Sequence, residues 1–131
     1  MMRAIVALAI LATVNAASAQ APAAVDPKTV PVIDGGIGPC SADFVVTDPV
    51  GKPVYDAKIR VHIAYRFAGA HKLDLEVGTN ADGKARFEGL PEKTRRGLSF
   101  QASHEDLEGT AFVDTAQTCK AQLTITLQKK R

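Results

Sequence analysis

Apolar and polar residues alternate along several short stretches of this chain, and a period of two predicts β-strands. The longest stretch covers residues 57–67. One side of it is apolar or aromatic: Ile59, Val61, Ile63, Tyr65 and Phe67. The other side is polar: Lys58, Arg60, His62 and Arg66. This pattern predicts a strand with one buried and one solvated face.

The segment around Asp82-Gly83 predicts a β-hairpin. Before it, apolar residues at 73, 75 and 77 alternate with charged residues at 72, 74 and 76. Glycine accepts a positive φ, so residues 80–83 are expected to form the turn. Residues 84–87 then form a short strand, which Gly89-Leu90-Pro91 is expected to end.

Four further segments complete a set of seven predicted strands: 41–47, 98–103, 110–115 and 120–128. The mature chain contains no segment with a convincing helical pattern. Short alternating strands separated by turns are typical of β-sandwiches. The expected fold class is therefore all-β, a seven-stranded immunoglobulin-like antiparallel sandwich.

The first 19 residues have the pattern of a secretory signal peptide. Arg3 precedes an apolar run over 4–14, and Ala17-Ser18-Ala19 supplies the small residues of a cleavage site. The run is shorter than the roughly 20 residues that a membrane-spanning helix needs. We expect a periplasmic or secreted bacterial product that has no membrane attachment once the signal is removed.

Residues 20–39 are rich in Ala, Pro and Gly and lack sustained periodicity. Such a composition favours a flexible leader, followed by one domain over 40–131. The alternative is an edge strand over 29–33.

Cys40 and Cys119 are the only cysteines, and an exported protein favours a disulfide between them. In the chain-entropy model this bond stabilises the fold by roughly 4 kcal/mol. The alternatives are free thiols or a metal pair, although two isolated sulfurs make a poor zinc site. Each cysteine directly precedes a predicted strand. Because a disulfide holds its Cα atoms roughly 4.4–6.8 Å apart, the first and last strands are expected to pair in parallel.

Two segments resemble carboxypeptidase regulatory-like domains. Residues 51–61 (GKPVYDAKIRV) are similar to the pattern that opens this family, G-x-P-V-x-x-A-x-V-x-V. Residues 79–91 (TNADGKARFEGLP) are similar to the hairpin pattern of the family, T-D-x-x-G-x-x-x-F-x-x-L-P. The resemblance covers about 40–127 and implies a transthyretin-like (prealbumin-like) sandwich. The matching residues specify a fold rather than an activity.

The residue types that could support catalysis or metal binding form no recognisable motif. Nothing in the spacing brings His62, His71 and His104 together with carboxylates such as those of Asp74, Glu76 or Glu105. A calcium loop starting at Gly78 would have Gly89 where a glutamate is required. We therefore assign no catalytic, cofactor-binding or metal-binding residue and expect no cofactor.

Two enzyme families have this kind of sandwich, and the chain departs from both. Hydroxyisourate hydrolases end in Y-R-G-S, whereas residues 128–131 read QKKR. Intradiol dioxygenases bind iron through two tyrosines and two histidines. Tyr55, Tyr65, His62 and His71 are present, but without that family's H-x-H spacing. We expect a protein that is not an enzyme.

Charge gives no indication of a nucleic-acid partner. Basic and acidic residues are interleaved, and the formal net charge of +2 falls to +1 without Arg3. The leading hypothesis is a non-catalytic exported binding or structural module of the cell envelope, with an unknown protein partner that could add to a sheet edge. The alternatives are a small-ligand domain for carbohydrate or metal, or a transthyretin-like hydrolase. Carbohydrate binding has weak support, because only Tyr55 is predicted to be an exposed aromatic residue.

Overall fold

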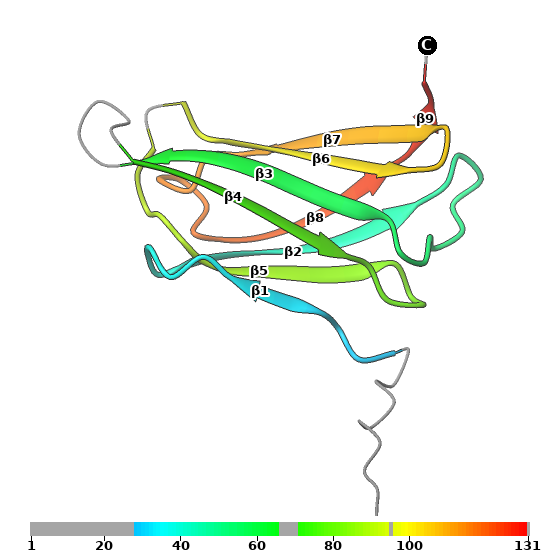
Figure 1. Cartoon of the computed structure of the whole chain (residues 1–131), viewed down its shortest axis with the longest axis horizontal. Coiled ribbons are helices and arrows are strands. Elements are labelled where there is room, and N and C mark those ends of the chain that lie inside the picture. The colour runs from blue at the N-terminus through cyan, green and yellow to red at the C-terminus, as the bar shows by residue number, and fades with distance from the viewer. Residues whose placement is uncertain (1–27, 66–70, 95, 131) are drawn as a thin grey trace, which may run out of the picture.

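The computed structural model describes residues 28–65, 71–94 and 96–130 and contains two packed β-sheets (Figure 1). The first sheet has the order β1 (Val32–Asp34), β5 (Lys84–Leu90), β2 (Cys40–Thr47) and β8 (Lys120–Thr126). The second has the order β4 (His71–Gly78), β3 (Lys58–Tyr65), β6 (Leu98–His104), β7 (Leu107–Val113) and β9 (Gln128–Lys129). No helix occurs in these residues, and so none that could cross a membrane. The all-β class is confirmed.

The described part of the chain contains nine strands, whereas the sequence predicted seven. The two additional strands are β1 and β9, with three and two residues. Segments this short show no usable alternation, and they extend because the edges of β5 and β7 offer them main-chain partners. The predicted signal peptide and the start of the leader lie outside the described residues.

Strand β1 lies within the segment predicted to be a flexible leader. It pairs in parallel with β5, and the amide of Arg86 donates to the carbonyl of Pro31 at 2.9 Å. The edge strand proposed as the alternative therefore exists, at 32–34 rather than 29–33. Main-chain hydrogen bonds to β5 hold this segment, and such bonds do not require a periodic sequence.

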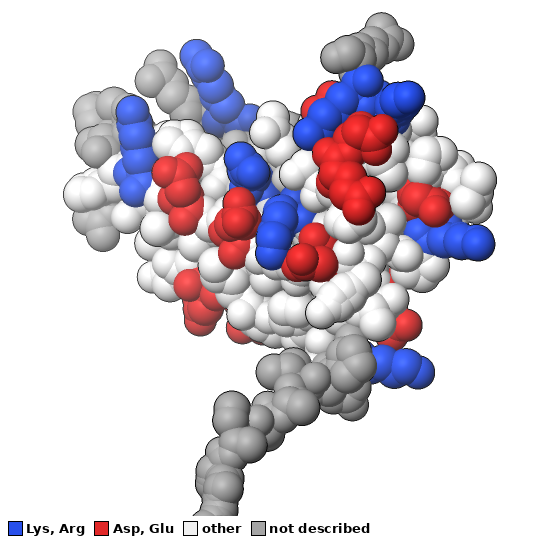
Figure 2. Space-filling view, turned by 45° about the vertical axis from the view of Figure 1, so that its right-hand side comes forward, with Lys and Arg blue, Asp and Glu red and all other residues white. Residues whose placement is uncertain are grey.

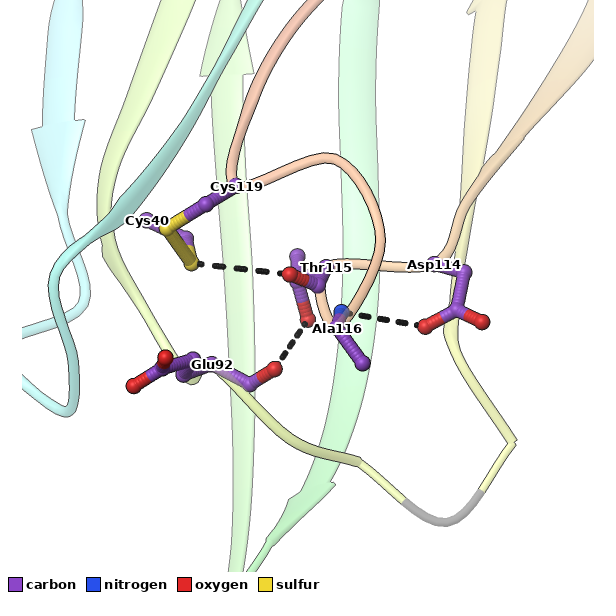
Figure 3. The surroundings of a disulfide bond; sticks show 6 residues. All are labelled: Cys40, Glu92, Asp114, Thr115, Ala116 and Cys119. Carbon is purple, nitrogen blue, oxygen red and sulfur yellow. Dashed lines mark hydrogen bonds between the residues drawn. A yellow bond between two sulfur atoms is a disulfide. The ribbon is translucent and has the colours of Figure 1, made fainter.

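The expected parallel pairing of the first and last long strands is confirmed. Strand β2 pairs with β8 from Ser41 opposite Lys120 to Thr47 opposite Thr126. Cys40 and Cys119 form a disulfide at the start of these strands, with Cα atoms 4.6 Å apart (Figure 3). The bond joins two neighbouring strands within one sheet.

The core lies between the sheets, and three phenylalanines from both layers meet in it. The ring of Phe100 in β6 lies 4.7 Å from that of Phe44 in β2 and 5.0 Å from that of Phe87 in β5, measured between centroids. All three side chains are almost fully buried. The predicted faces of β3 are also confirmed, because Ile59, Val61 and Ile63 are buried and the residues between them are exposed.

Two glycines determine how the hairpin joins its neighbours. Gly83 has a φ of 74°, and a Cβ at this position would overlap the carbonyl oxygen of Val46. Gly89 has a φ of 65° and lies against Asp34 and Gly36. Because β1 packs here, β5 continues to Leu90 and does not stop at residue 87 as predicted.

Candidate functional site

The polar side chains of the second sheet point away from the core and form an exposed surface, which we call the five-stranded face. It consists of outward residues from β3, β4, β6 and β7: Lys58, Arg60, His62, Lys72, Asp74, Glu76, Ser99, Gln101, Ser103, Glu108, Thr110 and Phe112. Successive side chains of a strand point to opposite faces, so the apolar residues fill the core and the residues between them lie in solvent. Residues in register lie side by side, as Arg60, Gln101 and Thr110 do.

A ladder of opposite charges crosses β3 and β4 on this face. Arg60 Nε lies 3.3 Å from Glu76 Oε2, and His62 Nδ1 lies 2.5 Å from Asp74 Oδ1. These side chains are more than half exposed, so each pair contributes little to stability. The molecular surface in Figure 2 shows the same interleaving of basic and acidic side chains.

A further ion pair lies where β3 begins. Lys58 Nζ donates to Asp56 Oδ1 at 2.9 Å. This hydrogen bond, together with the negative charge of Asp56, raises the pKa of Lys58 above its usual 10.5. The ion pair therefore links the turn before β3 to the first residue of that strand.

A shallow hollow of about 650 Å³ lies over β6, β7 and β9 on the same face. Its walls contain hydrogen-bonding groups of both kinds, from Arg60, Gln101, Ser103, Glu108, Thr110 and Gln128. Guanidinium, amide, hydroxyl and carboxylate groups in this arrangement can bind polar groups of a partner.

Phe112 is the largest apolar side chain exposed on the five-stranded face, with 60% of its surface accessible. Its ring covers Gly97, where an added Cβ would overlap the ring carbons. The sequence analysis placed Phe112 in a strand but missed its exposure. The neighbouring Val113 is also apolar, so the alternation was ambiguous. Phe112 lies two residues after Thr110 and four after Glu108, on the same side of the strand as these polar residues. This spacing indicated that its side chain points outward.

The structure does not bring His62 and His104 together. Lys58 is opposite Ser103, so His104 lies beyond the Lys58 end of β3, and His62 lies four residues in the other direction. At about 3.3 Å per residue, the two histidines are roughly 16 Å apart along the sheet. Glu105 adjoins His104 in the turn, whereas Asp74 and Glu76 accompany β3.

His71 lies on a different surface from His62. It starts β4 opposite Tyr65, with ring centroids 5.6 Å apart, and successive residues of a strand alternate between faces. Tyr55 lies in the turn before β3, at the opposite end of that strand from Tyr65. Over the described residues, no group of three His, Cys, Asp or Glu side chains is placed to hold a metal ion.

The outer face of the four-stranded sheet carries a compact ion-pair cluster. Arg86 donates to Glu88 Oε1 and Asp43 Oδ2, both at 2.7 Å. These two bonds, first to Glu88 and then to Asp43, raise the pKa of Arg86 further. A hollow of about 380 Å³ lies beside the cluster. Because its guanidinium is already bound on two sides, Arg86 ties β5 to β2.

No protein-family profile and no curated protein matches this chain. Among solved structures, it is similar to 3-chlorocatechol 1,2-dioxygenase from Rhodococcus opacus 1CP, with 16% identity, a TM-score of 0.46, and 79% of this chain aligned to 65% of that one. Chlorocatechol 1,2-dioxygenase from Pseudomonas putida gives 12% identity, a TM-score of 0.44, and coverages of 86% and 70%. The two aligned chains are thus longer than this one.

Proposed function

We propose that this protein is a non-catalytic, exported binding module of the bacterial cell envelope that engages a protein partner through its five-stranded face. The observation that carries the proposal is the exposure of Phe112 on a face otherwise made of polar and charged groups. Aromatic residues and arginine are enriched at the centres of protein interfaces. Phe112 and Arg60 supply both on one surface.

Export is supported by the sequence pattern of the first 19 residues and by the disulfide. A structural disulfide persists in oxidising compartments such as the periplasm or the extracellular space. The near-neutral, interleaved charge gives no basis for a nucleic-acid partner.

A non-catalytic role is supported by the separation of the reactive side chains. His62 is paired with an exposed aspartate, His71 lies beside Tyr65, and His104 lies at the far end of β6. General acid–base catalysis needs such groups in reach of one substrate atom. Their positions on three separate parts of the surface therefore favour a binding role.

We also assign the fold to the carboxypeptidase regulatory-like, transthyretin-like sandwiches. Each shared motif residue has a structural role that a sandwich requires. Gly83 closes the hairpin turn, Phe87 fills the core, and Pro91 follows the last residue of β5. The proposal about binding does not depend on this assignment.

The test is capture of partners from the envelope fraction of the native bacterium with the mature protein as bait. Phe112→Ser should abolish capture of a specific protein that the wild type retains. Val50→Ser is the matched control, because Val50 is 77% exposed but lies in a turn away from the face. Equal capture by all three proteins, or none by the wild type, would refute the proposal.

Carbohydrate binding is the second candidate, favoured by the polar hollow and by the exposed Phe112, which lies two residues along β7 from Thr110 in the wall of the hollow. Sugars offer hydroxyl groups to such walls and an apolar ring face to an aromatic side chain. This reading predicts that a glycan raises the melting temperature of the wild type but not of Phe112→Ser. A glycan screen without any shift would exclude it.

A further inference from the structure

Strand β4 is an edge of the five-stranded sheet, and only one of its sides is paired in the described structure. It pairs with β3 over eight residues, from Tyr65 opposite His71 to Lys58 opposite Gly78. On the other side the sheet order ends at β4. An edge of this length presents a row of main-chain groups that another strand can use.

The hydrogen bonds next to the strand show which residues of β4 direct these groups outward. The amide of Thr79 donates to the carbonyl of Ala57, and the carbonyl of Thr79 accepts from the amide of Asp56, both at 3.0 Å, so both main-chain groups of Thr79 face the chain that leads into β3. In an antiparallel ladder, successive residues of a strand direct their main-chain groups to opposite sides. The main-chain groups of Lys72, Asp74 and Glu76 therefore point away from β3.

The side chains of these three residues are exposed, and two of them, Lys72 and Glu76, carry opposite charges. In an antiparallel pair of two β4 strands centred on Asp74, Lys72 of each copy lies opposite Glu76 of the other. Opposite charges that face each other across two strands attract. A shift of one residue in the centre, to Leu75, would instead place Asp74 opposite Glu76 and create two repulsive pairs.

We propose that two copies of this protein associate through β4 in antiparallel register around a two-fold axis at Asp74. The two five-stranded sheets then form one continuous sheet, with an isologous interface in which each contact occurs twice. At the axis the two Asp74 side chains approach each other, and each has His62 as its partner within its own chain. This pairing goes beyond the proposed binding function, because it uses the strand edge and leaves Phe112 free.

Pairing along one strand buries a small area, so the dimer belongs to the weak class of interfaces. Charged side chains on an edge strand can also act in the opposite sense and keep copies apart. The two effects predict different oligomeric states. Sedimentation velocity of the mature protein, in a concentration series up to about 1 mM, distinguishes them.

The decisive experiment uses two charge reversals that each turn both attractive pairs into repulsive ones. Lys72→Glu places glutamates at positions 72 and 76, and Glu76→Lys places lysines at both, while Asp74 is unchanged. Each variant alone should dimerise about tenfold more weakly than the wild type. An equimolar mixture of the two should recover association, because both pairs formed by positions 72 and 76 are again opposite in sign, while Asp74 faces Asp74 as in the wild type. Lys52→Glu, an exposed change in a turn, is the charge-matched control and should dimerise like the wild type.

A second variant, Asp74→Pro, tests the main-chain bonds. It also removes the two carboxylates that face each other at the axis, a change that by itself favours association, so loss of the dimer would report the missing amide. Asp74→Pro removes an amide that faces away from β3, a position where a proline is tolerated in an edge strand. It should be a folded monomer by circular dichroism and sedimentation. A wild type that stays monomeric throughout the series, or single reversals that dimerise normally, would overturn the proposal. Capture by the five-stranded face is tested separately through Phe112→Ser, so either proposal can fail alone.

Discussion

Asn80 illustrates how a single buried side chain organises a turn. Its Oδ1 accepts hydrogen bonds from the amides of Asp82 and Lys84, both at 2.9 Å, and its Nδ2 donates to the carbonyl of Lys28 at 2.9 Å. Asn80 is 5% exposed. The segment that faintly resembles a calcium loop is thus a turn held by its own side chain, and it also fixes the chain that leads into β1.

We expect Asn80→Ala to lower the free energy of unfolding by about 1–2 kcal/mol, because it leaves three part-buried main-chain groups without their side-chain partner. Asn80→Asp keeps the acceptor oxygen and loses only the donor, so it should cost about half as much. Urea denaturation of both variants measures the difference. Equal losses would mean that the bond to Lys28 alone determines the effect.

The alternation of apolar and polar residues along β3 gives the strand one buried face and one exposed face. Ile63 is fully buried, whereas the next residue towards the N-terminus, His62, has a side chain that is 58% exposed. The same alternation that packs Ile63 in the core presents His62 to solvent. Elements with at least seven residues could therefore be located from sequence, as β2 to β8 were, although the outward side of β7 was not predicted.

We expect Ile63→Ala to cost roughly 2–5 kcal/mol of stability, since it removes buried carbons and leaves a cavity. His62→Ala, one position away, should cost less than about 1 kcal/mol, because its ion pair is exposed. Thermal or chemical denaturation compares them directly. The reverse order would show that the faces of β3 are inverted.

At the scale of the whole molecule, one covalent bond closes almost the entire domain. Cys40 and Cys119 are separated by 79 positions and join the starts of β2 and β8 (Figure 3). Cys40 is fully buried, and the amide of Ser41 donates to the carbonyl of Cys119 at 2.8 Å. The disulfide and the parallel ladder therefore hold the same pair of strands.

Replacing both cysteines with alanine should lower the free energy of unfolding by roughly 4 kcal/mol, as expected for a loop of this length. Reductant should destabilise the wild type and leave the double variant unaffected. Non-reducing mass spectrometry of the exported protein should show a deficit of about two hydrogens, since the bond forms by oxidation of two thiols. Two alkylatable thiols would contradict the disulfide.

Local alternation in the sequence predicted the seven strands β2 to β8 and the buried face of β3, and the presence of only two cysteines predicted the pairing of Cys40 with Cys119. Tertiary structure alone decided that 32–34 joins the edge of β5, that Phe112 is exposed, and that the histidines lie on separate surfaces. These features depend on strand order and register. Both arise from contacts between residues distant in sequence, which a local period does not encode.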